Sequence, residues 1–129
     1  GRNQATLETL REELRSERCE ARALDARDMD ATSALFREVA EEHGQVDGAV
    51  NLAGSIVLKP AHLTSPDEFD AVIQQNLRTA FSTVRAAAPV MRKERGGSII
   101  LVSSAAARVG LMNHDAIAAA KAARNTTGV

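Results

Sequence analysis

The order of events between residues 98 and 121 constrains the fold most. The short apolar run Ser98–Val102 predicts a buried strand of a parallel sheet. Two serines and a glycine-containing loop follow, and an alanine-rich helix begins near His114. This order puts Ser104 at the carboxyl end of a strand and Lys121 in the next helix. In open α/β sheets, ligands bind in the crevice beyond those strand ends.

The stretch before it predicts the other half of a strand–helix–strand unit. Asp47–Leu52 reads as a second strand, and a long helix starts where Ser65 is an N-cap with Glu68 three residues on, which is a capping box. We expect Pro89 to kink or shorten this helix before the glycines at 96–97 end it. The alternation of strand and helix predicts an α/β fold, a partial Rossmann-like, doubly wound parallel sheet with right-handed crossovers.

The first half predicts two helices around a short strand. Gln4–Glu17 carries leucines at helical spacing and reads as an amphipathic helix. Cys19–Leu24 alternates enough to be a strand. Asp30 can cap a second helix, which ends at His43 where Gly44 suits the left-handed position after a helix.

Composition narrows the class of protein. The chain has 129 residues, 44% of them hydrophobic, which predicts one domain with a real core. A net charge of −1 argues against nucleic acid or an anionic membrane as partner. With no long apolar run and no signal-peptide pattern, the default location is the cytoplasm. The lone Cys19 forms no internal disulfide and no metal cluster, and the chain has no Tyr and no Trp.

Several polar residues stand where they could carry chemistry, although each also has an ordinary structural interpretation. The tetrapeptide Asn51-Leu52-Ala53-Gly54 lies at the carboxyl end of a strand, where glycine permits close backbone approach to a ligand. It can equally be an ordinary turn. Asp25 can be a solvated turn residue. Ser104 can simply end a strand, and Lys121 among alanines can lie on a solvated helix face.

Asn76 is the more telling residue, because its amide lies on the apolar face of the long helix. Burying that amide unpaired would cost a few kcal/mol, so it should have hydrogen-bond partners. A satisfied structural asparagine is the ordinary alternative. The other residues of this face are Phe69, Ile73, Ala80, Val84 and Ala87.

Taken in order, these residues resemble the short-chain dehydrogenase/reductase family. Its active-site segment is a serine, twelve intervening residues, a tyrosine, three residues and a lysine; here Ser104, Ile117 and Lys121 occupy the frame. Asn51-Leu52-Ala53-Gly54 is similar to the family's N-N-A-G motif, and the run at Asp25 to its D-x-x-D segment. The context of Asn76 resembles the family's catalytic asparagine.

The resemblance implies a role for each matching residue. Ser104 would hydrogen-bond the substrate carbonyl, Asn76 would position a water in the proton relay, and Lys121 would hold the nicotinamide ribose. Asp25 would face the adenine ring. The remaining cofactor-side positions are Asn51, Ala53 and Gly54, which would steady the sheet beside the adenosine half, and Arg2, which would favour the 2′-phosphate of NADP, with NAD also possible.

Two departures from the family's pattern bear on activity. Ile117 stands where the family has its tyrosine, and it cannot donate a proton; His114, one turn earlier, is a possible surrogate or a surface residue of the first turn. The family's T-G-x-x-x-G-x-G turn is absent from the sequence, so we expect the chain to be the middle of a longer domain that binds NADPH weakly.

Two functions follow as hypotheses. The first is an NAD(P)-dependent oxidoreductase acting on a small carbonyl or alcohol substrate, with impaired activity in this chain. The alternative is a non-catalytic Rossmann-like interaction module. The resemblance implies a homo-oligomer through the helices at 65–95 and 114–126, whose small alanines would permit close approach or simply reflect helix propensity.

Overall fold

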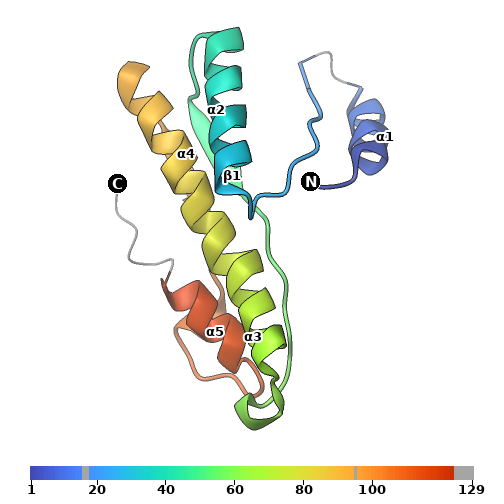
Figure 1. The fold of residues 1–129 in the computed structure, drawn as a ribbon, viewed down its shortest axis with the longest axis vertical. Coiled ribbons are helices and arrows are strands. Elements are labelled where there is room, and N and C mark those ends of the chain that lie inside the picture. Colours follow the sequence, from blue (N-terminus) through green and yellow to red (C-terminus); the bar gives the residue numbers. More distant parts are fainter. Residues whose placement is uncertain (16–17, 95, 124–129) are drawn as a thin grey trace.

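A computed structural model describes residues 1–15, 18–94 and 96–123 (Figure 1). The elements are α1 (Gln4–Leu14), α2 (Met29–His43), β1 (Gly48–Asn51), η1 (Ala61–Leu63), α3 (Pro66–Ile73), η2 (Gln74–Arg78), α4 (Thr79–Glu94), β2 (Ser98–Leu101), η3 (Ala105–Ala107) and α5 (Asp115–Ala122). Helices and parallel strands alternate in the second half of the chain, which confirms the predicted α/β class.

The strands β1 and β2 form a parallel pair, with Ala49 opposite Ile99 and Asn51 opposite Leu101. Parallel strands need a crossover connection, and α3, η2 and α4 supply it as one long helical segment (Figure 1). The carboxyl ends of both strands therefore lie at the same edge of the sheet. This arrangement confirms the predicted strand–helix–strand unit.

The crossover begins at the predicted capping box. Ser65 Oγ accepts a hydrogen bond from the Glu68 backbone N–H at 3.2 Å, and the Glu68 carboxylate accepts one from the Ser65 N–H at 2.9 Å. Glu68 also accepts a hydrogen bond from Lys59 Nζ at 2.5 Å. Pro66 stands at the first helical position, where its missing N–H costs nothing. These contacts fix where the long helix starts.

The prediction that Pro89 shortens the helix was wrong. The helix continues through Pro89, which is exposed, to Glu94. The irregular turn lies earlier, at Gln74–Arg78, which is π-helical. There Asn76 Nδ2 donates to the Val72 carbonyl one turn back at 2.9 Å, and a side chain that takes a helical carbonyl loosens the backbone ladder.

The predicted strand at Cys19–Leu24 was also wrong, because this segment forms no strand. Strands persist only when a neighbour accepts and donates their backbone hydrogen bonds, and β1 and β2 pair with each other. Leu24 N–H donates to the Gly1 carbonyl at 2.6 Å, which ties the segment to the start of the chain. The helix predicted over Gln4–Glu17 ends at Leu14, and Glu17 lies outside the described residues.

Helix α2 is capped by Asp28 and not by Asp30 as predicted. The Asp28 carboxylate accepts from the N–H groups of Asp30 and Ala31 at 3.1 and 2.9 Å, so the helix starts earlier. Asp30 lies in the first turn and pairs with Arg85 of α4 at 3.2 Å. The predicted end is confirmed, since Gly44 has a φ of +82°.

Two apolar clusters hold the described part of the chain together. The first lies between α2, α4 and β1, and the second joins α3 to α5 (Figure 1). Helices α2 and α4 thus cover one face of the sheet, while its other face exposes Val50, Leu52, Ile100 and Val102. No helix of the described ranges is long and apolar enough to span a bilayer.

Candidate active site

Asn51 ends β1 and turns its side chain into the protein. Its Nδ2 donates to the Thr79 carbonyl at 2.8 Å and to Thr83 Oγ1 at 2.7 Å, both on α4. Asn51 is 5% exposed, and its Oδ1 is a buried acceptor without a partner among the described residues. The Asn51 amide group therefore holds the end of the strand against the crossover helix, while its oxygen makes no hydrogen bond with the described residues.

Gly54 follows three residues later and packs directly on two of the predicted site residues. An ideal Cβ at this position would lie 2.8 Å from Asn76 Oδ1 and 3.5 Å from Lys121 Nζ. The first distance is shorter than real Cβ contacts allow, so a side chain here would displace the amide. The absence of a side chain at Gly54 therefore lets the turn, Asn76 and Lys121 meet.

Asn76 is fully buried in η2, and its amide is held from both ends. Nδ2 donates to the Ser55 carbonyl at 3.0 Å and to the Val72 carbonyl at 2.9 Å, while Oδ1 accepts from the Ser55 N–H at 3.4 Å. This confirms the expectation that the amide has partners. The contacts clamp the turn after β1 against the long helix.

Lys121 is buried, with 9% of the residue exposed, so its interpretation as a solvated lysine was wrong. Its Nζ donates to the Val102 carbonyl at 3.0 Å, just beyond the end of β2. The aliphatic stem reaches from α5 across the strand end to the turn at Gly54. An ammonium group is thereby placed at the carboxyl edge of the sheet, beside the amide of Asn76.

In the structure Ser104 and His114 make local contacts, and only the Ser104 side chain caps a helix. Ser104 Oγ accepts from the Ala106 N–H at 3.3 Å at the start of η3. His114 is the residue before α5, and its Nδ1 lies 2.7 Å from the Met112 carbonyl. The neighbouring Ser103 donates its hydroxyl to the Lys121 carbonyl at 3.4 Å. Ser104 thus lies two residues from the carbonyl that holds Lys121, without a described hydrogen bond to it.

Ile117 is a core residue of the second apolar cluster. It is 3% exposed and packs with Val72, Ala116 and Ala120. The side chain that replaces the family's tyrosine therefore fills space between α5 and α3, and it offers no proton. Lys121 lies one turn further along the same helix face.

Asp25 precedes α2 in sequence and lines a different depression, beside the start of that helix. This open hollow of about 860 Å³ is also lined by Arg27, Arg78 and Arg85. The hydrogen bonds from Arg27 lower the pKa of Asp25 from 3.8 to about 2, and Arg2 adds a small further effect. The closest contact, from Arg27 Nη2 to Asp25 Oδ2, is 2.6 Å.

Some residues that shape the site were missed from the sequence. Ser55 clamps Asn76 through its backbone, and Thr79 and Thr83 hold Asn51. The two threonines stand four residues apart, on the buried side of the long helix, and that spacing was the available signal. The backbone groups of Ser55 and Val102 had no sequence signal, because any residue supplies them.

The fold and the arrangement at the strand ends define a class of protein. Residues 1–127 match the family described as short chain dehydrogenase, and the chain belongs to the short-chain dehydrogenase/reductase family.

Similar proteins include a reductase, a dehydrogenase and an oxidoreductase of known structure. The chain is 32% identical over 105 residues to the 3-oxoacyl-[acyl-carrier-protein] reductase FabG of Staphylococcus aureus, covering 80% of this chain and 43% of the relative. It is 34% identical over 125 residues to the 2,3-dihydro-2,3-dihydroxybenzoate dehydrogenase of Bacillus subtilis, covering 94% and 47%. A metagenomic short-chain oxidoreductase solved in complex with NADP has a TM-score of 0.85 at 32% identity, covering 97% and 58%. The chain thus spans about half the length of its curated relatives.

Proposed function

We propose that this chain is part of an NAD(P)-dependent oxidoreductase that interconverts a small carbonyl compound and an alcohol. Residues 1–129 belong in this proposal to one Rossmann-like cofactor domain. The observation that carries it is the buried ammonium group of Lys121 at the carboxyl edge of the sheet, held by the Val102 carbonyl at 3.0 Å. Burying a charged group is costly unless it is paired or hydrogen-bonded. The Lys121 ammonium lies at the edge where such sheets bind ligands.

The residues present fit the ribose end of a nicotinamide cofactor. The Lys121 ammonium lies at the carboxyl edge of the sheet, next to the turn at Gly54. When bound, the nicotinamide supplies the hydride. In the proposal Lys121 donates hydrogen bonds to the ribose hydroxyls. Arg2 and Asp25 act at the adenosine end, with NADP favoured over NAD.

The remaining site residues serve the substrate. Ser104 donates its hydroxyl to the substrate carbonyl, and Asn76 orders the turn after β1 so that water can reach the site in a defined place. The buried Ile117 leaves the proton-donor position empty, so the proposed activity is low. The His114 ring is engaged with the Met112 carbonyl, which supports the interpretation as a residue at the start of α5 over that of a surrogate acid.

Assembly and location complete the proposal. The proposal includes a homo-oligomer formed through the long crossover helix and α5, and a cytoplasmic location. Within the chain α3 and α5 already pack together through Val72, Ile117 and Ala120. A further copy would add to this pair of helices.

The experiment is a titration of the ¹⁵N-labelled chain with NADPH, followed by NMR. We expect weak binding, with a dissociation constant of roughly 1 mM, because no glycine-rich turn contributes N–H groups to the pyrophosphate. The shifts should gather at Gly54, Asn76 and Lys121. Lys121→Met should abolish them, whereas the matched control Lys59→Met, which removes a surface lysine paired with Glu68, should not.

Shifts that survive Lys121→Met would contradict the proposed ribose contact. If NADPH and NADH both leave the spectrum unchanged, the alternative of a non-catalytic interaction module gains support.

A further inference from the structure

One cluster of side chains outside the proposed oxidoreductase site has the composition of a metal site. Glu20 lies in the segment before α2, and Glu42 and His43 lie at the end of α2. Each residue offers one ligand atom, and the three atoms lie within 4.8 Å of one another. Together they form the Glu-Glu-His cluster. Within the described ranges no second group of three such side chains comes this close.

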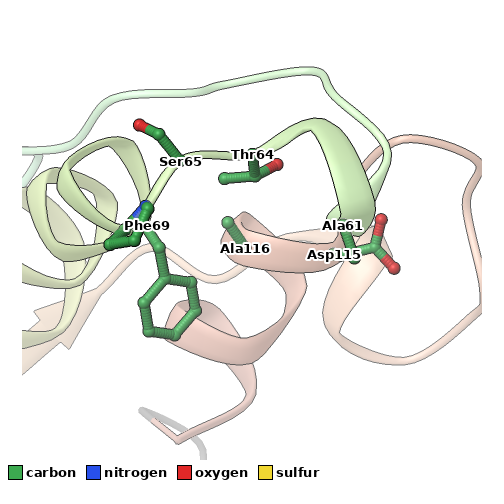
Figure 2. A pocket seen from close by; sticks show the side chains of 7 residues that line it. Ala61, Thr64, Ser65, Phe69, Asp115 and Ala116 are labelled. Carbon is green, nitrogen blue, oxygen red and sulfur yellow. The ribbon is translucent and has the colours of Figure 1, made fainter.

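The Glu-Glu-His cluster lies apart from the surfaces already assigned. Helix α2 ends before β1 begins, so the cluster is near the amino edge of the sheet, opposite the edge that holds Gly54 and Lys121. Figure 1 shows the end of α2 and helix α5 at opposite ends of the molecule. The pocket between η1, α3 and α5 (Figure 2) lies on the helices proposed as the interface between copies, and the cluster shares no element with it.

The distances inside the cluster are close to those between the ligands of one metal ion. His43 Nε2 lies 3.6 Å from Glu20 Oε1 and 3.9 Å from Glu42 Oε2. Both separations are too long for a hydrogen bond. A tetrahedral zinc ion, about 2.0–2.2 Å from each ligand, keeps neighbouring ligand atoms about 3.3–3.6 Å apart. A small rotation of the exposed carboxylates would therefore let one ion reach all three residues.

Arg22 holds the two carboxylates in place without using all of their oxygens. Its Nη2 donates to Glu20 Oε2 at 2.7 Å and to Glu42 Oε2, and its Nη1 lies 3.6 Å from Glu38 Oε2. The other oxygen of Glu20, Oε1, is the one nearest His43, and it accepts no hydrogen bond from the described residues. The hydrogen bond from Arg22 also lowers the pKa of Glu20, so this carboxyl group is ionised. Such hydrogen bonds orient a carboxylate for metal binding.

We propose that the Glu-Glu-His cluster binds a divalent transition-metal ion, represented here by zinc. An imidazole nitrogen with two carboxylate oxygens suits zinc and disfavours magnesium, which prefers oxygen ligands alone. Water would complete the coordination, because Glu20 and His43 line an open hollow of about 350 Å³. Arg18 and Arg22 also line this hollow, and their charge lowers the affinity expected for a cation.

The ion would join two parts of the chain that the sheet does not connect. The segment at Glu20 forms no strand, whereas His43 ends a helix that packs on the sheet. A shared metal ion would fasten the first to the second. The site is independent of the nicotinamide proposal, since it uses none of the same residues.

The test is a titration of the ¹⁵N-labelled chain with zinc chloride, followed by NMR in a buffer that does not bind the metal. We expect saturable shifts at Glu20, Arg22 and His43, with a dissociation constant on the order of 0.1 mM, weaker than a closed four-ligand site. Magnesium chloride at the same concentrations should leave His43 unmoved. Zinc shifts confined to other residues, or equal binding of both metals, would overturn the proposal.

Matched substitutions identify the ligands. His43→Gln and Glu20→Gln should each weaken zinc binding about tenfold or more, because each removes a ligand atom. The controls His62→Gln, in η1, and Glu41→Gln, beside the cluster on α2, should leave the affinity unchanged. All four side chains are exposed, so these variants should fold as the parent does.

A further variant separates the cluster from the neighbouring thiol. Cys19 is a free cysteine next to Glu20 in sequence, and a thiolate is also a zinc ligand. Cys19→Ser should keep the zinc affinity. Binding that is lost in Cys19→Ser and kept in both His43→Gln and Glu20→Gln would make the thiol the ligand and the proposal wrong.

Discussion

Lys121 and Ile117 lie one turn apart on α5, and both are buried for different reasons. Lys121 carries its charge to a carbonyl at the end of a strand, while Ile117 fills an apolar gap against Val72. A lysine whose ammonium has a fixed acceptor can be buried at acceptable cost, and an isoleucine at the next turn adds packing energy. In the proposed site, Lys121 would serve the cofactor and Ile117 would offer no acid.

A tyrosine placed at position 117 tests whether the missing acid limits the proposed activity. We expect Ile117→Tyr to raise carbonyl reduction by roughly 10²–10⁴-fold, the usual contribution of a positioned acid. The measurement uses a chimera in which the Staphylococcus aureus reductase supplies the rest of the domain. The larger ring should also cost about 1–3 kcal/mol of unfolding free energy, because it overfills the cluster.

Two controls belong to that experiment. A further Lys121→Ala change should remove most of the gain, since the lysine would hold the ribose and lower the pKa of the phenol. His114→Ala in the Ile117 parent should change little. Loss of a substantial parental activity in His114→Ala would make the histidine the acid and the assignment of Ile117 wrong.

The pKa of the Asp25 carboxyl group can be measured directly. Hydrogen bonds from Arg27 lower its pKa from 3.8 to about 2, so the folded form prefers the carboxylate. The stabilisation is fully present above pH 3.8 and is lost as the pH falls through about 2. Carboxyl-carbon NMR should show this low midpoint, and Arg27→Gln should return it toward 3.8. Arg37→Gln, on the exposed side of α2, should leave it in place; an unchanged midpoint in Arg27→Gln would contradict the assignment.

At the scale of elements, the crossover helix begins with a complete capping box and contains a π-helical turn. The capping box at Ser65 and Glu68 satisfies the first backbone N–H groups of α3. The π turn at Gln74–Arg78 then turns Asn76 toward the strand ends, where Ser55 holds it. The segment therefore begins as a regular α-helix and becomes π-helical where the Asn76 side chain takes a backbone carbonyl as its acceptor.

The cap can be tested by one substitution. Ser65→Ala should lower the free energy of unfolding by about 0.5–2 kcal/mol, because the Glu68 N–H loses its acceptor. Urea denaturation measures the change. Ser33→Ala is the matched control, since that hydroxyl only bonds the Met29 carbonyl within α2, and its effect should stay within about 0.5 kcal/mol. Equal losses in both variants would mean that the box does not stabilise the helix.

At the scale of the whole molecule, the sheet is covered on one side. Helices α2 and α4 bury Ala49 and Asn51, while Val50 and Ile100 of the opposite face are 59% and 55% exposed. Contiguous apolar surface of this kind binds apolar dyes. The chain should therefore enhance the fluorescence of anilinonaphthalene sulfonate.

Polar substitutions locate that binding. The double change Val50→Thr and Ile100→Thr should reduce the dye signal markedly, because it removes methyl groups from neighbouring strands of one face. Val109→Thr alters a residue of similar exposure, 55%, away from the sheet and should have little effect. If the double variant binds as much dye as the parent, the open face is not the site of binding.

The sequence by itself determined the elements whose signals are local. The capping box at Ser65, the left-handed glycine after α2 and the apolar strand at 98–101 depend on near neighbours, so their patterns predicted them. The prediction that this strand is buried was wrong, since Ile100 is 55% exposed on the uncovered face of the sheet. The order of strand, helix and strand then predicted the parallel pair. The resemblance to the family's motifs indicated Asn76 and Lys121 as candidate site residues.

Tertiary structure decided everything that depends on a partner far along the chain. Cys19–Leu24 has strand-like residues, yet a strand also needs a neighbour to share its backbone hydrogen bonds, and alternation along one segment cannot say whether it has one. The buried Lys121 reaches the Val102 carbonyl at 3.0 Å, and its position is set by how α5 packs on α3. Local pattern records what a residue prefers, whereas burial and pairing depend on which segments meet, and only the folded chain brings those together.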